Sequence, residues 1–168
     1  MASFVKDIDK GWNRIQAQLR KLDGSYTKVG YPEEKTGDKQ VESGGGDFNL
    51  AGLAATMNDG TTEAGRNHDV VIPARPFMTN AFETGTKTAS LVITREYNAV
   101  LAGKRIARKA LSRVGEWFVG KIKKEITQGD FEDIKQATID RRTGKSTKPL
   151  IDTGQLRNSV THVEVMKL

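Results

Sequence analysis

One short sequence near the C-terminus has the residue types of a hydrolytic site. Leu150-Ile151-Asp152-Thr153-Gly154 contains the Asp-Thr-Gly triplet of aspartic proteases, in which the Asp shares a proton with a second carboxylate. A retroviral-type protease needs most of its chain after this triplet, whereas only residues 155–168 follow it here. We therefore expect Asp152 to shape a corner of the backbone, and hydrolysis at Asp152 is the alternative that mutation would test.

Two glycine-containing sequences resemble parts of phosphate-binding loops. Gly144-Lys145-Ser146 ends like such a loop, but the glycine required five residues before Gly144 is replaced by Ile139. No apolar strand precedes this sequence. Gly44-Gly45-Gly46 also lacks a strand and a helix in the required order. The sequence therefore predicts no nucleotide site.

Histidine and cysteine are too scarce to predict a metal centre. His68 and His162 are the two histidines, and the chain has no cysteine. His162 and Glu164 can share one face of a strand, but no third ligand is in view. The lack of cysteine excludes a disulfide framework, a thiolate metal site and a cysteine nucleophile. We expect no catalytic residues, no metal and no cofactor, and a protein that is not an enzyme.

The composition is that of one small globular domain. The chain has 168 residues, of which 36% are hydrophobic and 29% are charged, so we expect a single domain over residues 1–168 with a lean core. Either some apolar surface is buried in an oligomer or the loops are long. No stretch reaches the roughly 18 apolar residues of a membrane span, and residues 1–7 lack a signal-peptide core. We expect a soluble product with no membrane partner.

Residues 2–22 have the three- and four-residue apolar spacing of an amphipathic helix. Its apolar positions are Phe4, Val5, Ile8, Trp12, Ile15, Leu19 and Leu22. Gly24 is suited to end this helix because glycine adopts the left-handed conformation at low cost. Within residues 1–23 the helix either packs on the sheet or forms an arm that docks on a neighbouring subunit. We expect Trp12 and Trp117 to pack in the core.

Three strands and three polar connections follow from the pattern. We expect strands at 25–31, at 70–72 and after Val160, where polar and apolar residues alternate. The polar connections are residues 33–48, 61–69 and 131–148. We expect residues 33–48 to be a long mobile loop, because their periodicity is lost and glycines are frequent.

Helical spacing recurs in the middle of the chain. We expect a short helix at 49–58, a helix from Pro76 to Leu101, and a long helix at 104–127 that Gly129 ends. The predicted fold class is α+β: a small antiparallel or mixed β-sheet packed with the N-terminal helix and a long central helix, with long mobile loops.

The net charge of +6 is concentrated in the last of these helices. Between positions 104 and 124 the basic residues are Lys104, Arg105, Arg108, Lys109, Arg113, Lys121, Lys123 and Lys124, and the acidic residue is Glu116. One dominant sign favours an acidic partner, whereas a solvated helix is the alternative. We name Arg105, Arg108, Lys109 and Arg113 as the candidate charged interface.

Two proline-containing stretches are the most specific features of the sequence. Ile72-Pro73-Ala74-Arg75-Pro76-Phe77 ends a short strand and opens a helix, whereas Lys148–Val160 begins as a turn and leads into the last strand. Within the second stretch, one helical turn and extended chain both fit the spacing. We expect the following to be structural residues: Pro73, Arg75, Pro76, Phe77, Pro149, Asp152, Thr153 and Gly154.

In this order and at this spacing, the two stretches resemble segments of the tailed-bacteriophage neck and tail-completion proteins, also called virion morphogenesis or minor tail proteins. That family carries an "xIPARPFx" segment and a "KPLIDTGQLRNSI"-like segment. The resemblance covers roughly residues 25–165 and includes a similar Val29-Gly30-Tyr31-Pro32 step. At Asn58-Asp59-Gly60 the family has Asn-Glu-Phe-Gly, so the likeness is looser there.

The resemblance implies a structural virion protein. Family members form rings in the neck or upper tail and complete the tail so that it joins a DNA-filled head. It implies a homo-oligomeric ring of six or twelve copies, assembled in the host cytoplasm against head-connector, neck, tail-terminator or tail-tube proteins, with non-specific contact to genomic DNA. A non-specific DNA-binding accessory protein is the alternative. Because the two motifs occur together in the family, Asp152 is a candidate partner for the Arg75 guanidinium.

Overall fold

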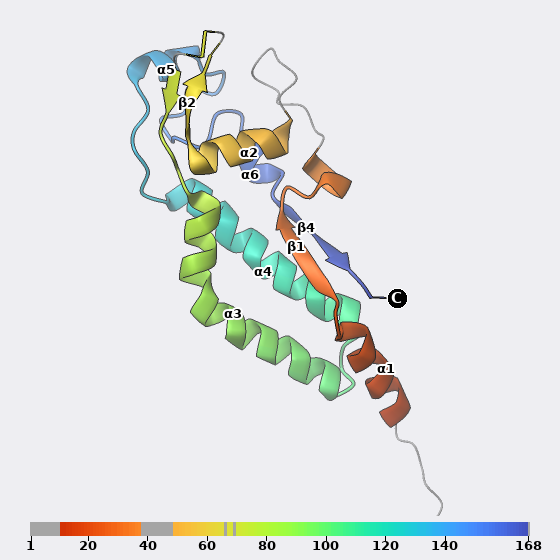
Figure 1. Cartoon of the computed structure of the whole chain (residues 1–168). Helices are drawn as coiled ribbons and strands as arrows, with labels where there is room; N and C mark the ends of the chain where they lie inside the picture. The colour runs from red at the N-terminus through yellow and green to blue at the C-terminus, as the bar shows by residue number, and fades with distance from the viewer. Residues whose placement is uncertain (1–10, 38–48, 66, 69, 168) are drawn as a thin grey trace, which may run out of the picture.

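A computed structural model describes residues 11–37, 49–65, 67–68 and 70–167 (Figure 1). The predicted α+β class is confirmed, with two small antiparallel sheets and a long central helix. The elements in chain order are α1 (Trp12–Leu22), β1 (Tyr26–Gly30), a π-helical turn η1 (Glu33–Gly37), α2 (Leu50–Asp59), β2 (Thr61–Ala64), β3 (Val70–Ile72), α3 (Phe77–Leu101), α4 (Ala107–Gln128), α5 (Gln136–Arg141), α6 (Gln155–Asn158) and β4 (Thr161–Val165).

Helices α3 and α4 form an antiparallel hairpin along the length of the molecule (Figure 1). Helix α3 buries one narrow stripe, with steps of three or four residues, made of Phe77, Ala81, Gly85, Ala89, Val92, Glu96 and Val100. A Cβ atom on Gly85 would lie 3.4 Å from the Trp117 ring, so Trp117 of α4 packs over this position of α3. Most of the remaining surface of α3 is exposed, because α3 lies at the edge of the molecule.

The opposite side of α4 is covered by a two-stranded antiparallel sheet of β1 and β4, in the register Tyr26 to Val165 through Gly30 to Thr161. The His162 ring lies where a Cβ atom on Gly115 would be, with ring atoms 2.7 Å from that position. The missing side chain at Gly115 therefore allows β4 to pack directly on α4.

A second two-stranded antiparallel sheet joins β2 to β3. The prediction of a polar loop over residues 61–69 is wrong for Thr61–Ala64, which pair with the apolar strand β3. A polar segment can form a strand when a neighbouring strand supplies the hydrogen bonds. The local sequence of residues 61–64 does not show that β3 is this neighbour. The single predicted sheet is thus two separate antiparallel sheets.

The core gathers residues from distant parts of the chain. Its buried members are Leu50, Ala54, Phe77, Ala81, Ile122, Ile126, Leu150, Leu156 and Val160. The short helix predicted at 49–58 is confirmed as α2, which contributes Leu50 and Ala54 to this core, and the Asn49 side chain caps it by accepting from the Gly52 N–H at 2.8 Å. These contacts link α2, α3, α4 and the C-terminal stretch through one continuous apolar cluster.

The N-terminal helix differs from its prediction in two ways. Helix α1 begins at Trp12, after a left-handed Gly11 with φ of 101°, and residues 2–10 of the predicted helix lie outside the described part. Trp12 is 58% exposed, so its expected place in the core is wrong. No residue between Trp12 and Leu22 is buried. Gly24 follows the helix with φ of 72°, as expected.

Other boundaries also shift. Residues Glu33–Gly37 of the predicted loop form η1, and residues 38–48 lie outside the described part. The connection 131–148 contains α5, and Pro76 precedes α3 by one residue. Among the described residues, no helix is both long enough and apolar enough to cross a membrane.

Helix α1 is attached to the turn between α3 and α4 by polar contacts. The Arg14 guanidinium donates to the Gly103 carbonyl at 3.0 Å, and the Gln18 side chain accepts from the Ala107 N–H at 2.9 Å. Gln18 therefore satisfies a backbone donor that the first turn of α4 leaves free. Near this turn, in the last part of α3, Glu96 is only 2% exposed and is paired with Arg105.

Removing Arg105 should strongly destabilise the fold, because it leaves the buried Glu96 carboxylate without its main charge partner. For Arg105→Met we expect a loss of roughly 3–5 kcal/mol in unfolding free energy, measured by urea denaturation. The double variant Glu96→Met with Arg105→Met should recover most of this loss, since no buried charge remains. Equal stability of the single and double variants would contradict this account of the pair.

Candidate functional site

The two proline-containing stretches meet on the same core. Phe77 from the first stretch, and Leu150, Leu156 and Val160 from the second, are all buried in the main apolar cluster. The two stretches are distant in sequence but adjacent in the fold, and each stretch supports the packing of the other. These four side chains therefore have a packing role in the core.

The first stretch is a corner fixed by α2. The Arg75 N–H donates to the Met57 carbonyl at 2.9 Å, and the Met78 N–H donates to the Asn58 side chain at 3.0 Å. Gly60 ends α2 with φ of 75°, and a Cβ atom there would lie 2.7 Å from the backbone nitrogen of Ala74. The half-buried prolines, Pro73 and Pro76, restrict the backbone on both sides of Arg75.

The second stretch is held by Arg142, which the sequence analysis did not identify. Its guanidinium donates to the carbonyls of Ser146 (3.0 Å), Lys148 (2.6 Å), Ile151 (2.9 Å) and Pro149 (2.6 Å). One side chain thus satisfies carbonyl acceptors from both sides of the proline turn. Burial lowers the pKa of Arg142 from its ordinary value, while nearby Asp152 opposes that shift.

The Asp152-Thr153-Gly154 triplet forms a turn. The Thr153 hydroxyl accepts from the Gln155 N–H at 3.2 Å, and Gly154 adopts φ of 84° before the one-turn helix α6. The Asp152 carboxylate accepts from the Gly144 N–H at 3.2 Å. Asp152 therefore binds a distant backbone group and joins the Gly144-Lys145-Ser146 segment to the turn, which gives that segment a structural role.

Arg75 is the unusual residue of this region. It is 5% exposed, and within the described residues its Nε has no hydrogen-bond partner. Burial lowers the pKa of Arg75, nearby Glu132 raises it, and nearby Arg142 lowers it further. The expected pairing of Arg75 with Asp152 is not found among the described residues. Asp152 lies beside Arg142, and the carboxylate that raises the pKa of Arg75 is that of Glu132.

A cavity of about 480 Å³ adjoins the turn. Its lining includes Leu53 and Met57 of α2, Arg142, Pro149 and the Asp152–Gly154 triplet. The lining is mixed, and its polar residues Arg142, Asp152 and Thr153 already make contacts within the chain. Within the described residues, no group of three or more histidine, aspartate or glutamate side chains is arranged to hold a metal ion.

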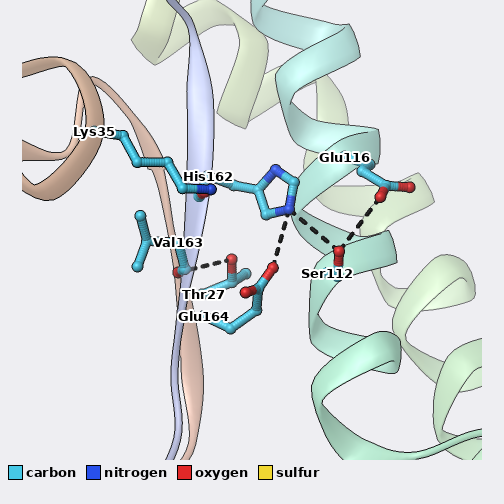
Figure 2. A network of polar contacts seen from close by, with 7 residues as sticks. All are labelled: Thr27, Lys35, Ser112, Glu116, His162, Val163 and Glu164. Atoms are coloured by element: carbon cyan, nitrogen blue, oxygen red, sulfur yellow. Dashed lines mark hydrogen bonds and ion pairs between the residues drawn. The ribbon is translucent and has the colours of Figure 1, made fainter.

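A second polar cluster lies between β4 and α4 and contains a serine, a histidine and a glutamate (Figure 2). His162 Nε2 lies 3.1 Å from a Glu164 carboxylate oxygen and 3.3 Å from the Ser112 hydroxyl. The Ser112 hydroxyl is also 3.3 Å from Glu116 and donates to it. In a catalytic triad the serine and the carboxylate contact opposite ring nitrogens.

Here both groups contact the same nitrogen of His162, so the carboxylate cannot orient the ring for proton removal from Ser112. Near this cluster, Lys35 donates to the His162 carbonyl at 2.6 Å, and the Thr27 hydroxyl donates to the Val163 carbonyl at 3.3 Å (Figure 2). These contacts connect β4 to α4, β1 and η1, so the cluster has a structural role.

The candidate charged interface divides into two parts. Arg105 pairs with buried Glu96, so its guanidinium stabilises the helix hairpin. Arg108, Lys109 and Arg113 are exposed, and the described residues place no ion pair on any of them. These three residues, called the basic face below, keep their charges available to a partner.

Comparisons with protein-family models, with curated proteins and with solved structures found no match to this chain.

The Gly144 contact gives a test of the turn. Because a Cβ atom on Gly144 would lie 2.5 Å from the Asp152 carbonyl oxygen, Gly144→Ala should push the two segments apart. We expect a loss of roughly 1–3 kcal/mol in unfolding free energy. Gly120→Ala is the control, since its Cβ meets nothing within 4 Å and alanine favours a helix. Equal effects of the two substitutions would disprove the close approach.

Tyr31 connects β1 to the second stretch and predicts a pH effect. Its hydroxyl donates to the Leu156 carbonyl at 2.8 Å, and burial raises its pKa. The unfolded chain loses this proton near pH 10, whereas the native state keeps it, so stability present below pH 10 falls as the pH rises above it. Tyr31→Phe should cost about 1 kcal/mol at pH 8, and this cost should shrink above pH 10. Chemical denaturation from pH 8 to 11 would refute the effect if both proteins lost stability in parallel.

Proposed function

We propose that this chain is a structural subunit of a tailed-phage virion, which forms a ring in the neck or upper tail and helps to join the tail to a DNA-filled head. The observation that carries this proposal is the pair of stretches Ile72–Phe77 and Lys148–Val160, in the order and spacing of the tail-completion family. The packing of both stretches on one core supports the proposal, because an assembly subunit needs a rigid frame for its contacts.

The mechanism in this proposal is geometric. A closed ring forms when each subunit offers two different surfaces related by a rotation that returns to the start. Exposed apolar residues are available at two ends of the molecule: Val70 and Val71 on the β2–β3 sheet, and Trp12, Ile93 and Tyr97 near α1 (Figure 1). Such surfaces, distant from one another, suit contacts with different neighbours.

The basic face has two candidate partners in this setting. One is an acidic surface of an adjacent ring, and the other is the DNA that occupies the channel. Arg108, Lys109 and Arg113 lie on one helix without charge partners among the described residues. Phosphate contacts by these residues would be sensitive to salt and independent of base sequence.

A non-specific DNA-binding accessory protein is the second candidate, and the same basic face favours it. This candidate requires a monomer or dimer that binds duplex DNA with a steep dependence on salt. Neutralising Arg108, Lys109 and Arg113 would lower the slope of log affinity against log salt by about 0.9 for each phosphate contact removed. Ring formation without DNA binding would exclude this candidate.

The mass and shape of the purified protein test the proposed function. We expect light scattering and negative-stain imaging at two salt concentrations to find rings, because the exposed apolar surfaces persist at high salt. Six copies would match the symmetry of a tail and twelve that of a portal. A subunit that remains monomeric, both alone and when mixed with neck and tail-tube proteins from the same genome, would contradict the proposal.

A further inference from the structure

An open apolar groove of about 400 Å³ lies between α1, α3 and α4. Its larger apolar lining residues are Leu19, Leu22, Ile93, Tyr97, Leu111 and Val114, and all six are half-buried or exposed, whereas Ala110 beside them is buried. Two carboxylates also line it: Glu96, which pairs with Arg105, and Asp23, whose side chain is largely exposed. The groove is therefore apolar at its base, and the Asp23 carboxylate at its rim lies 3.9 Å from Lys167 Nζ.

The C-terminal half of α3 has more apolar residues than the subunit covers. Ala89, Val92 and Val100 face the helix hairpin and are buried, whereas Ile93, Tyr97 and Leu101 form an adjoining stripe at four-residue spacing that is exposed. A helix that is apolar on most sides is usually buried on most sides. Together with α1, which buries no residue between Trp12 and Leu22, this stripe indicates a surface that assembly covers.

The chain itself contains a segment suited to this groove. Residues 1–10 lie outside the described part, and their sequence places Phe4, Val5 and Ile8 at the spacing of one helical face. The segment thus offers three large apolar side chains to an apolar groove.

The length of the segment allows the groove of a neighbouring subunit to receive it. Residues 1–10 precede Trp12 at the N-terminal end of α1, whereas the groove lies at Leu19 and Leu22 near the C-terminal end. Ten residues span up to about 33 Å when extended, which is enough to reach a subunit packed alongside. Repeating the same exchange around an axis joins each subunit to the next, because donor and receiver are different surfaces.

We propose that the groove between α1, α3 and α4 of one subunit binds residues 4–8 of a second copy of this chain. This inference rests on the proposed ring and identifies one contact that closes it. Phe4, Val5 and Ile8 of the donor occupy the apolar base formed by Leu19, Ile93 and Tyr97 of the receiver.

Disulfide cross-linking between two full-length variants tests this exchange, since the natural chain has no cysteine. One variant carries Asp7→Cys and the other carries Asp23→Cys at the groove rim. After oxidation of a mixture, we expect a covalent heterodimer as the main product on a denaturing gel. Adding Ile93→Glu to the Asp23→Cys variant should reduce this product at least tenfold.

Leu91→Glu is the matched control. Leu91 is 69% exposed and Ile93 is 50% exposed on the same helix, but Leu91 is absent from the groove lining. The control should leave cross-linking unchanged, and thermal unfolding should find both glutamate variants folded. Equal losses in the two variants would overturn the proposal, because they would indicate a general effect of the added charge.

Two further outcomes separate this inference from the proposed function. If rings form but the mixture gives no heterodimer, the groove contact is refuted while the ring stands. If a single chain carrying both cysteines forms only an internal disulfide, the segment binds its own groove and the exchange is refuted. A heterodimer that forms while no ring is found supports the exchange and counts against the proposed function.

Discussion

The described structure depends on close approach to both sides of α4. Helix α3 packs on one side, where Gly85 lies against Trp117, and strand β4 packs on the other, where the His162 ring fills the space beside Gly115. A side chain at Gly115 would meet the His162 ring at 2.7 Å and would separate β4 from the helix that carries Ile122 and Ile126 of the apolar cluster. Since protein interiors are close-packed, that separation would reach the proline corners as well.

Local patterns predicted the parts of this fold that local interactions determine. Helices α2, α3 and α4 follow from apolar spacing, and the left-handed Gly24 after α1 follows from the low cost of that conformation for glycine. Strand β2 was missed because its hydrogen bonds come from β3 across an intervening segment. The exposure of Trp12 was missed because periodicity identifies an apolar face without showing what covers it.

The backbone turns of the candidate site were predicted from the sequence, but the contacts of its charged side chains were not. The proline corner and the Asp-Thr-Gly turn follow from residue type. The four carbonyls around Arg142 and the pairing of Arg105 with Glu96 join segments whose contact no spacing rule reveals. Because residues 131–148 are polar and lack periodicity, the sequence does not indicate that Arg142 makes these contacts. Arg75 was expected to bind a specific acceptor, whereas its Nε is buried without one among the described residues.

This division between frame and surface is the basis of our functional account. The two proline-containing stretches contribute to the core, and exposed basic and apolar surfaces lie on α1, α3 and α4. The most direct measurement is to inactivate the gene in the genome that encodes the chain and to image the resulting lysate by electron microscopy. Our account predicts DNA-filled heads and separate tails that join when the purified protein is added. Normal virions, or empty heads beside complete tails, would contradict it.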